Sequence, residues 1–399
     1  MMPPGQSPRV AIFRSELLPR SETFIKTQAL ALRRWHPVLA GNRRVWDGLP
    51  LGEVDVRVSG SYAPQHRALL RTCQLVGLPH RPTHRLLASL DADLIHVHFG
   101  TDATDLWPSI RVLGKPVLVT LHGYDINIHR EWWEAGHGGL ARRSYPKRLL
   151  ALSRIPNVRF IAVSEAVRAR AVAFGLPKDT ITICHIGVDT SAFAPVVDTQ
   201  FRRKRVLFIG RLVKNKGVDV LIRAFAMVHA KVPDAELTVV GDGPLRDDLE
   251  RQAATDSLPV RFLGAMSHDR VKNELASARL LCQPSVTIAS GASEGFGLVI
   301  LEAQACGVPV ITSARGGSTE GIIEGVTGFR FAEGDALAAA TAMTTLLTDD
   351  ATLSSMSSNA RKFVIERYRL DDCTARLEDI YDEHMFFCRA QLTARGAMQ

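Results

Sequence analysis

The stretch SEGFGLVILEAQACGVPVI, residues 293–311, places one acid at each end of an apolar run. Glu294 stands directly before two glycines, Gly295 and Gly297, and Glu302 lies eight positions further along. Eight helical residues rotate by roughly 800°, so a helix through this run would bring both acids within about 80° of one face. Its first N–H groups would be open to an anion beside the small residues. Because carboxylates accept hydrogen bonds from hydroxyls, the stretch predicts a site for a diphosphate that carries sugars.

The composition is that of an ordinary globular protein. The chain has 399 residues, of which 46% are hydrophobic and 23% are charged, and this length allows two or three domains. No run approaches the roughly 20 apolar residues of a membrane span, and the first residues lack a signal-peptide core. The six cysteines are scattered without a CxxC pair, which favours reduced, mostly buried thiols. We therefore expect a cytoplasmic protein.

The two halves of the chain differ in charge. Residues 1–200 hold 25 Lys and Arg against 16 Asp and Glu, a balance of +9, whereas residues 201–399 hold 24 against 25, a balance of −1. The basic residues are dispersed as singles and pairs. A solvated basic face is one interpretation, and peripheral contact with the anionic inner face of the plasma membrane is the other. No nucleic-acid partner is predicted.

Short apolar, β-branched runs alternate with helical patterns in both halves, which predicts an α/β protein with parallel sheets covered on both faces. The predicted strands are residues 9–13, 94–100, 116–123, 158–164, 180–187, 205–210, 236–241, 259–264, 279–285 and 308–313. A loop-like join before a fresh strand indicates two facing Rossmann-like domains with an interdomain cleft, where ligands bind outside the carboxyl ends of the strands. The predicted domains are residues 1–195, residues 196–370, and a C-terminal helix, 371–399, that packs back on the first domain.

Two cations follow a predicted strand in FIGRLVKNKGVDVLIRAF, residues 208–225. The strand ends at Gly210, and a helix begins after Gly217. Arg211 and Lys216 lie between them, beside a helix N-terminus whose unpaired N–H groups carry partial positive charge. This arrangement suits a diphosphate, and its alternative is a surface corner with two solvated cations.

A second glycine turn, GDGP, follows another predicted strand. Gly241 and Asp242 open it, and glycine permits a flat ring to approach the backbone closely. The alternative is a plain turn. The acids of the opening stretch have a plain alternative too, in which Glu294 merely favours the helix dipole and Glu302 is an exposed helix residue.

These motifs, in this order and spacing, resemble the retaining glycosyltransferases of family 4, which have the GT-B fold. The resemblance rests on GRLVKNKG (210–217), GDGPL (241–245), EGFGLVILEAQACGVPVI (294–311) and GGSTEGIIEGVTGF (316–329). More loosely, the first half is similar to colanic-acid-type transferases of bacterial exopolysaccharide assembly, through SETFI (21–25), HVHFG (96–100) and TLHGYDI (120–126). One departure is the long segment PSVTIASGASEG (284–295), which falls on the sugar side of the site.

The resemblance implies a retaining hexosyltransferase that uses a UDP- or GDP-sugar, acts on a glycan or lipid-linked acceptor, and requires no metal or other cofactor. It implies catalytic roles for His122, Glu294, Arg211 and Lys216. The implied donor-binding residues are Gly210, Gly241, Asp242, Leu263, Phe296, Gly297, Leu298 and Glu302. Those implied on the acceptor side are Ser21, Glu22, Thr23, His98 and Asp125.

Three alternatives remain open. His96 and His98 share a strand face and His122 ends a nearby strand, so the three could ligate zinc in a hydrolase or serve as core polar contacts. Ser21, Glu22 and Thr23 could cap the next helix instead of meeting an acceptor. On the same scaffold, a sugar-nucleotide epimerase or a non-catalytic sugar-nucleotide-binding subunit would also bind the donor.

Overall fold

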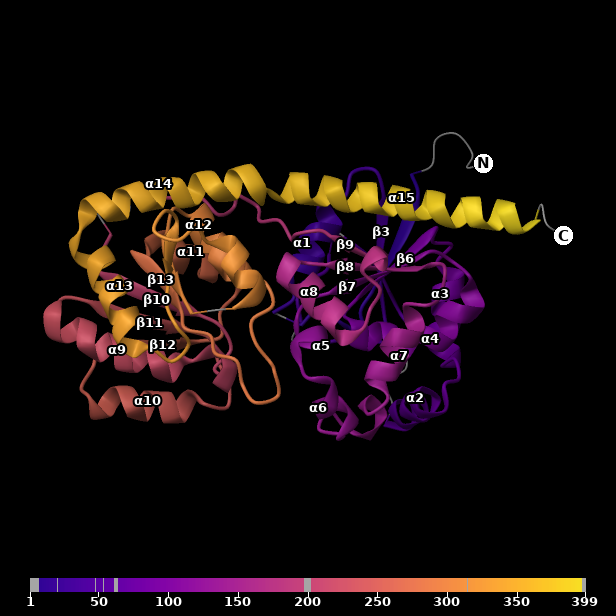
Figure 1. Cartoon of the computed structure of the whole chain (residues 1–399), viewed down its shortest axis with the longest axis horizontal. Helices are drawn as coiled ribbons and strands as arrows, with labels where there is room; N and C mark the ends of the chain where they lie inside the picture. The colour runs from indigo at the N-terminus through magenta and orange to yellow at the C-terminus, as the bar shows by residue number, and fades with distance from the viewer. Residues whose placement is uncertain are drawn as a thin grey trace. The chain divides into compact units, whose positions relative to one another are not determined.

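The structure, a computed structural model, describes residues 7–19, 21–46, 48–52, 54–60, 64–196, 202–313 and 315–396. Two compact units make up the chain (Figure 1). The first contains residues 1–186 together with 371–399, and the second contains residues 187–370. Among the described residues, no helix combines the length and apolarity that a membrane span requires.

The first unit is built on a parallel sheet which, within the described residues, has seven strands in the order β5-β3-β1-β6-β7-β8-β9. The strands are β1 (Arg9–Phe13), β3 (His36–Gly41), β5 (Asp55–Val58), β6 (Leu94–His98), β7 (Val117–Leu121), β8 (Val158–Ala162) and β9 (Ile181–Ile183). Strands β6 and β7 are buried at every position, as expected for strands covered on both faces. The strand order reverses between β1 and β6, and in open α/β sheets ligands bind outside the carboxyl ends of the strands at such a reversal.

Helices connect the strands of the first unit. They are α1 (Thr23–Ala31), α2 (Pro64–Val76), α3 (Arg81–Ser89), α4 (Gly100–Leu113), α5 (Tyr124–Asn127), α6 (Arg130–Glu134), α7 (Tyr145–Leu152) and α8 (Glu165–Phe174), with short 3₁₀ helices η1 (Leu140–Arg142) and η2 (Lys178–Thr180) and a two-strand ribbon of β2 (Glu16–Leu17) and β4 (Arg43–Arg44). Local signals set some boundaries. The Ser164 side chain accepts from the Val167 N–H to begin α8, and left-handed Gly175 ends that helix.

The last helix, α15 (Leu370–Gly396), packs on the first unit. One carboxylate oxygen of Glu378, itself 3% exposed, accepts hydrogen bonds from the backbone N–H groups of Arg33, Arg34 and Trp35 at 2.6–3.1 Å. The Trp35 indole donates to Asp382 at 3.0 Å. A buried charge is tolerated only when its hydrogen-bonding capacity is used, so these contacts define where the helix docks.

The second unit carries a parallel sheet with six strands among the described residues, in the order β12-β11-β10-β13-β14-β15. Its strands are β10 (Arg205–Ile209), β11 (Glu236–Val240), β12 (Val260–Gly264), β13 (Leu280–Gln283), β14 (Val310–Thr312) and β15 (Gly328–Arg330). Its helices are α9 (Val218–Lys231), α10 (Arg246–Thr255), α11 (His268–Ser277), α12 (Leu298–Ala305), α13 (Ala336–Thr348) and α14 (Asp350–Arg367), with η4 (Lys214–Lys216) and η5 (Gly316–Gly321). The strand order reverses between β10 and β13.

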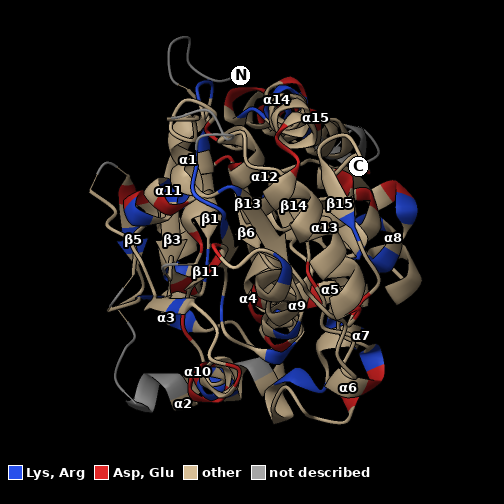
Figure 2. Cartoon of the chain, turned by 90° about the vertical axis from the view of Figure 1, so that its left-hand side faces the viewer, with Lys and Arg blue, Asp and Glu red and all other residues tan. Residues whose placement is uncertain are grey.

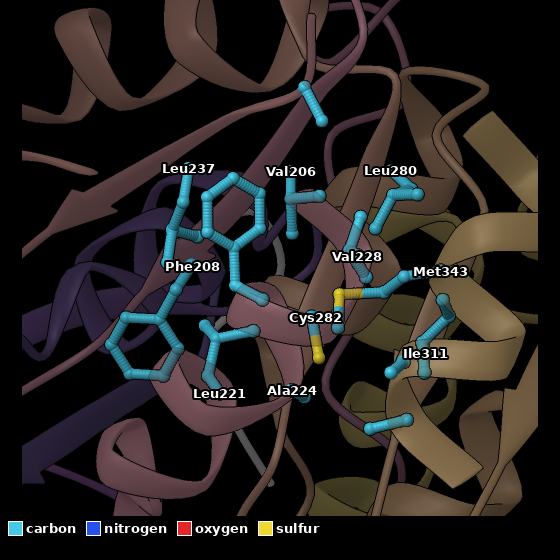
Figure 3. Packing of buried hydrophobic residues seen from close by; sticks show 14 of the residues in the cluster. Val206, Phe208, Leu221, Ala224, Val228, Leu237, Leu280, Cys282, Ile311 and Met343 are labelled. Atoms are coloured by element: carbon cyan, nitrogen blue, oxygen red, sulfur yellow. The ribbon is translucent and has the colours of Figure 1, made fainter. Parts of the chain in front are cut away.

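A core of buried apolar side chains holds β10 in the second unit. Figure 3 shows Phe208 of β10 beside Leu221 of α9, with Met343 of α13 close to Cys282 and Ile311. All five side chains are fully buried. Burial of a large apolar side chain contributes about 1.5–3 kcal/mol, so this cluster holds the strand whose carboxyl end carries the Arg211 loop.

Most of the predicted organisation is present, and the prediction of parallel sheets in two Rossmann-like domains is confirmed. Every predicted strand range contains a strand. The predictions missed β3, β5 and β15 because their segments, HPVLAG, DVRV and GFR, are short or carry polar residues. The predicted strand at 180–187 is shorter than expected: regular structure ends at Ile183, and a loop leads into the second unit.

On several surface helices, basic and acidic residues alternate and are not separated by sign. Figure 2 shows basic and acidic residues interspersed along α6, α8 and α10. On α8, for example, Arg168 pairs with Glu165 at 2.7 Å, and on α10 Arg246 pairs with Glu250 at 2.7 Å. Exposed pairs of this kind contribute at most about 1 kcal/mol each.

Candidate active site

In the second unit, the loops that follow β10 and β11 meet closely at the carboxyl edge of the sheet. Gly210 directly follows β10, and Gly241 follows β11 with φ +137°. A Cβ built on Gly241 would overlap the carbonyl oxygen of Gly210. Only glycine fits this close approach, so the two strand ends form one tight platform next to the reversal in strand order.

The two predicted cations lie beside this platform in different states. Arg211 is exposed, and its guanidinium has no hydrogen-bond or ion-pair partner among the residues that the structure describes. Lys216, in η4, forms an ion pair with Glu294, whose side chain is 18% exposed. The fold thus joins two predicted site residues that are separated by 78 positions in the chain, and it leaves a third free.

Helix α12 begins at Leu298, just after the two glycines. Gly297 is its N-cap with φ +72°, and no side chain caps the helix. Glu294 lies in the preceding loop, so the helical-rotation argument for placing it on a face with Glu302 is wrong. The open first turn retains N–H groups and partial positive charge for an anion. The Phe296 side chain is 5% exposed and contacts the Tyr368 ring, with centroids 5.7 Å apart.

Glu302 stands inside α12 without a counter-ion. Its carboxylate has no hydrogen-bond or ion-pair partner among the described residues. Desolvation by the surrounding protein raises the pKa of Glu302 to about 7. A desolvated carboxylate is costly unless something donates hydrogen bonds to it, and a ligand with hydroxyl groups would do so.

The remaining predicted donor residues lie at the outer strands. The exposed Asp242 side chain accepts a hydrogen bond from the Gly243 N–H at 2.7 Å and stands 3.9 Å from Arg246. Leu263, on β12, is half-buried. The carboxylate of Asp242 therefore stabilises its own turn.

In the first unit, histidines gather at the carboxyl ends of β6 and β7. Nδ1 of His98 and Nε2 of His122 are 2.9 Å apart. Burial, followed by the influence of neighbouring histidines, holds the pKa values of His98 and His122 well below their usual range. Both rings are therefore neutral at pH 7, and one hydrogen atom joins the two nitrogens.

Asp125 holds the loop that carries His122. It is fully buried and accepts three backbone hydrogen bonds, from Gly100 at 2.8 Å, Gly123 at 3.0 Å and His122 at 3.1 Å. Burial raises the pKa of Asp125 to about 6, although these N–H groups favour the charged form. Both carboxylate oxygens accept backbone hydrogen bonds, so Asp125 supports the loop that carries His122.

Arg14 organises the other side of this edge and was missed by the predictions. It donates to Glu22 at 2.6 and 2.9 Å and to Asp102 at 2.6 Å, and its guanidinium lies 4.3 Å from the Phe99 ring centroid. Phe99 has φ +71° at the start of α4, a strained conformation for a side-chain-bearing residue. A cation placed directly after β1 was the available signal, because loops after parallel strands line the binding edge.

The structure decides against one of the two predictions for the SETFI segment. Helix α1 begins at Thr23, and no side-chain hydrogen bond caps it, so the capping prediction is wrong. Glu22 is 7% exposed and bonds Arg14 through both oxygens. Ser21 is exposed and Thr23 half-buried.

The zinc interpretation meets a geometric obstacle. Both nitrogens of His96 are engaged, Nδ1 with the Tyr381 hydroxyl at 2.7 Å and Nε2 with Thr120 Oγ1 at 2.6 Å. In the part of the chain that the structure describes, no group of three His, Cys, Asp or Glu residues is arranged to hold a metal ion. His96 is instead a core polar contact, as the simpler prediction had it.

Comparison with known proteins gives the chain a family. Residues 196–363 match the family described as Glycosyl transferases group 1, and residues 22–192 match Glycosyltransferase Family 4. Over 312 residues the chain is 30% identical to the GDP-mannose-dependent alpha-(1-6)-phosphatidylinositol monomannoside mannosyltransferase of Mycolicibacterium smegmatis, covering 74% of this chain and 78% of that protein. The chain belongs to the family 4 glycosyltransferases.

One further relative and one solved structure extend the comparison of this glycosyltransferase. The amylovoran biosynthesis glycosyltransferase AmsK of Erwinia amylovora is 31% identical over 256 residues, covering 62% of this chain and 60% of that protein. The crystal structure of Anabaena HepE in complex with UDP superposes with a TM-score of 0.73 at 20% identity, over 94% of this chain and 100% of HepE. The predicted family and GT-B fold are therefore confirmed.

Proposed function

We propose that this glycosyltransferase transfers a hexose from a nucleotide diphosphate sugar to a lipid-linked or glycan acceptor, with retention of the anomeric configuration, in cell-surface glycolipid or polysaccharide assembly. One observation carries the proposal. Arg211, which has no partner among the described residues, the Lys216–Glu294 ion pair and the uncapped start of α12 all belong to loops and a helix at the carboxyl side of the second unit's sheet. Cations and open N–H groups suit a diphosphate, and carboxylates accept hydrogen bonds from sugar hydroxyls.

The chemistry follows from where charge develops. As the bond between the anomeric carbon and the diphosphate breaks, an oxocarbenium-like sugar forms and negative charge grows on the leaving phosphate. Arg211, Lys216 and the α12 N–H groups would favour that state over the ground state. No side chain stands out as a nucleophile, so the acceptor attacks from the face that the diphosphate leaves, and the departing phosphate takes the acceptor proton.

The ion pair has a specific part in this scheme. Before the donor binds, Lys216 and Glu294 neutralise each other. When it binds, Lys216 turns to the phosphate and Glu294 accepts hydrogen bonds from the sugar hydroxyls. Glu302 accepts hydrogen bonds from the ribose hydroxyls, which stabilise its otherwise desolvated carboxylate. The family resemblance assigns His122 to the sugar side.

The first donor to test is GDP-mannose, because the mannosyltransferase relative from Mycolicibacterium smegmatis is described as GDP-mannose-dependent and acts on a phosphatidylinositol monomannoside. UDP-sugars are the second choice, since the fold is shared with a HepE structure that holds UDP. The AmsK relative, named for amylovoran biosynthesis, supports the exopolysaccharide alternative for the acceptor.

A lipid-linked acceptor calls for contact with a membrane surface, and α2 offers one. Its exposed apolar residues and those next to it form the α2 surface: Leu69, Leu75, Val76, Leu78 and Leu140, the last on η1, which contacts α2. Exposed basic side chains, Arg71 on α2 and Arg143 and Lys147 after η1, accompany them. Each basic residue near an anionic membrane contributes about 1 kcal/mol, so apolar insertion and charge act together.

Proton NMR of the purified protein with each donor tests the reaction. GDP-mannose, UDP-glucose, UDP-galactose and UDP-N-acetylglucosamine are incubated without acceptor, and the anomeric signals are followed. Slow hydrolysis of one donor, with the α sugar appearing first, is the expected result. A new sugar nucleotide would indicate the epimerase, and binding without turnover on any acceptor would indicate the non-catalytic subunit.

Vesicle binding tests the membrane contact separately. The protein should sediment with phosphatidylglycerol vesicles at low salt and detach as salt rises. Val76→Glu should weaken this binding about tenfold or more, because it places a charge in the apolar surface. Val326→Glu, at an exposed valine of the second unit, is the matched control. Equal binding by both variants would remove the α2 surface from the proposal.

A further inference from the structure

A line of buried polar side chains runs from α15 to His122 inside the first unit. It comprises Tyr381 of α15, His96 and His98 of β6, and His122 after β7. Tyr381 is 0% exposed, and His96 and His98 are each 1% exposed. Burial of this much polar surface is costly unless it is hydrogen-bonded.

At the α15 end of the line, two hydrogen bonds hold the ring of His96. Nδ1 of His96 meets the Tyr381 hydroxyl at 2.7 Å, and Nε2 meets Thr120 Oγ1 at 2.6 Å. With both nitrogens bonded, the ring can neither rotate nor flip without losing a buried hydrogen bond. The His98 ring lies against it, with centroids 4.4 Å apart and planes tilted by 32°. Tyr381 therefore restrains His98 through the ring of His96.

The near end of the line determines which nitrogen of His122 is available. Nε2 of His122 faces Nδ1 of His98 at 2.9 Å. Because both rings are held neutral by burial, a single hydrogen lies between these two nitrogens. If His98 donates it, Nδ1 of His122 carries a hydrogen, and if His122 donates it, Nδ1 is a bare acceptor. In both cases only Nδ1 of His122 remains for a substrate.

We propose that His98 and Tyr381 are positioning residues for His122, with His98 selecting its tautomer and Tyr381 holding His98 through His96, so that Nδ1 of His122 meets the sugar. The inference rests on the proposed function for the part played by His122. It gives α15 a task in catalysis besides docking, since the helix that ends the chain restrains the ring that faces the substrate.

The rings of Phe24 and Phe99 pack against His122. Their ring centroids lie 5.0 and 4.5 Å from that of His122, so apolar rings bound it on other sides. Apolar contacts hold a ring in place but do not choose between its tautomers, which only a hydrogen-bond partner can do. The choice therefore falls to His98.

Four variants test the proposal. His98→Phe keeps a ring and removes the hydrogen bond, whereas His98→Asn keeps an amide near the position of Nδ1. Tyr381→Phe removes only the hydroxyl. Arg34→Ala is the control, because it removes the side-chain ion pairs to Glu378, Asp379 and Asp382 on α15 but leaves the backbone hydrogen bond to Glu378 and the line itself in place. Thermal unfolding of each variant establishes that the compared samples are folded.

Two readouts are compared. Nitrogen-15 NMR of histidine-labelled protein without donor, assigned with His122→Gln, should show one His122 tautomer in the wild type and in His98→Asn but a mixture in His98→Phe. With the donor that the wild type uses, kcat should fall about tenfold or more in His98→Phe and about threefold in Tyr381→Phe. The donor KM should stay within about twofold, and His98→Asn should keep most of the activity. Arg34→Ala should match the wild type in both readouts.

Unchanged His122 resonances in His98→Phe would overturn the proposal, whatever the activity. So would a changed tautomer with wild-type kcat in His98→Phe and His122→Gln, because His122 would then take no part in the reaction. If the wild type turned over no donor, the proposed function would fail, while the resonances would still decide whether His98 sets the tautomer. Should His98→Phe not fold, Tyr381→Phe and His98→Asn carry the same test.

Discussion

Replacing Arg211 with alanine should separate catalysis from stability more cleanly than any other change in the second unit. The side chain is exposed and makes no hydrogen bond or ion pair with the residues that the structure describes, so its loss should change the free energy of unfolding by no more than about 0.5 kcal/mol. In the transition state the same guanidinium would face the charge growing on the leaving phosphate. Loss of one such donor typically costs about 2.7–4 kcal/mol, or 10²–10³ in kcat. Because Lys216 remains nearby, we expect about 100-fold.

The assay is initial-rate hydrolysis or transfer with the donor that the wild type uses, alongside thermal unfolding of the same preparation. Arg223→Ala, on α9, is the matched control: among the described residues its exposed side chain pairs with Asp219 alone, one turn away, at 3.0 Å. That variant should keep wild-type kcat. If Arg211→Ala stayed within twofold of the wild type while remaining folded, the assignment of the diphosphate to this loop would be refuted.

Three further changes test the second unit. Glu302→Gln should raise the free energy of unfolding at pH 8 by about 1–2 kcal/mol but leave it unchanged at pH 4. The pKa of Glu302 is about 7 in the folded state, above its usual value, so ionisation of the carboxyl as pH rises disfavours the native state. Urea unfolding at both pH values measures the difference, and an equal effect at pH 4 and pH 8 would contradict the reasoning. Gly241→Ala should lower the free energy of unfolding by about 2–5 kcal/mol and abolish nucleotide binding in calorimetry, because its Cβ would overlap the Gly210 carbonyl oxygen at a strained φ. A variant with near wild-type stability would show that the two strand ends can move apart. Phe208→Ala should cost about 3–5 kcal/mol in urea unfolding through a core cavity, and a loss below 1 kcal/mol would mean that the core refills.

The site was predictable where chemistry is local in the chain. Arg211 and Lys216 could be found because each follows a strand within a few residues, and the carboxyl ends of parallel strands form the binding edge. The contact of Lys216 with Glu294 could not be predicted without the family resemblance, since 78 positions separate them. Helical periodicity gave the wrong position for Glu294, because the helix begins only after Gly297 and the residues around the two glycines form a loop.

In the first unit the same limit is sharper. The pattern HVHFG placed His96 and His98 on one strand face, and this follows from the period of two alone. Which histidine would be a locked core contact and which would face His122 depends on Tyr381, which is 285 positions from His96. The role of Glu22 likewise depends on Arg14, whose guanidinium reaches it from the end of β1.

The alternation of strand and helix, the family, and the glycines and cations at strand ends could all be inferred from the amino-acid order, because they depend on periodicity and on neighbours within a few residues. The pairing of charges and the contact of α15 with the histidines became visible only in the folded chain. Both depend on distance in space, and folding brings together residues far apart in the sequence. A carboxylate such as Glu302 acquires a pKa of about 7 from its folded surroundings, and nothing in its neighbouring residues encodes that environment.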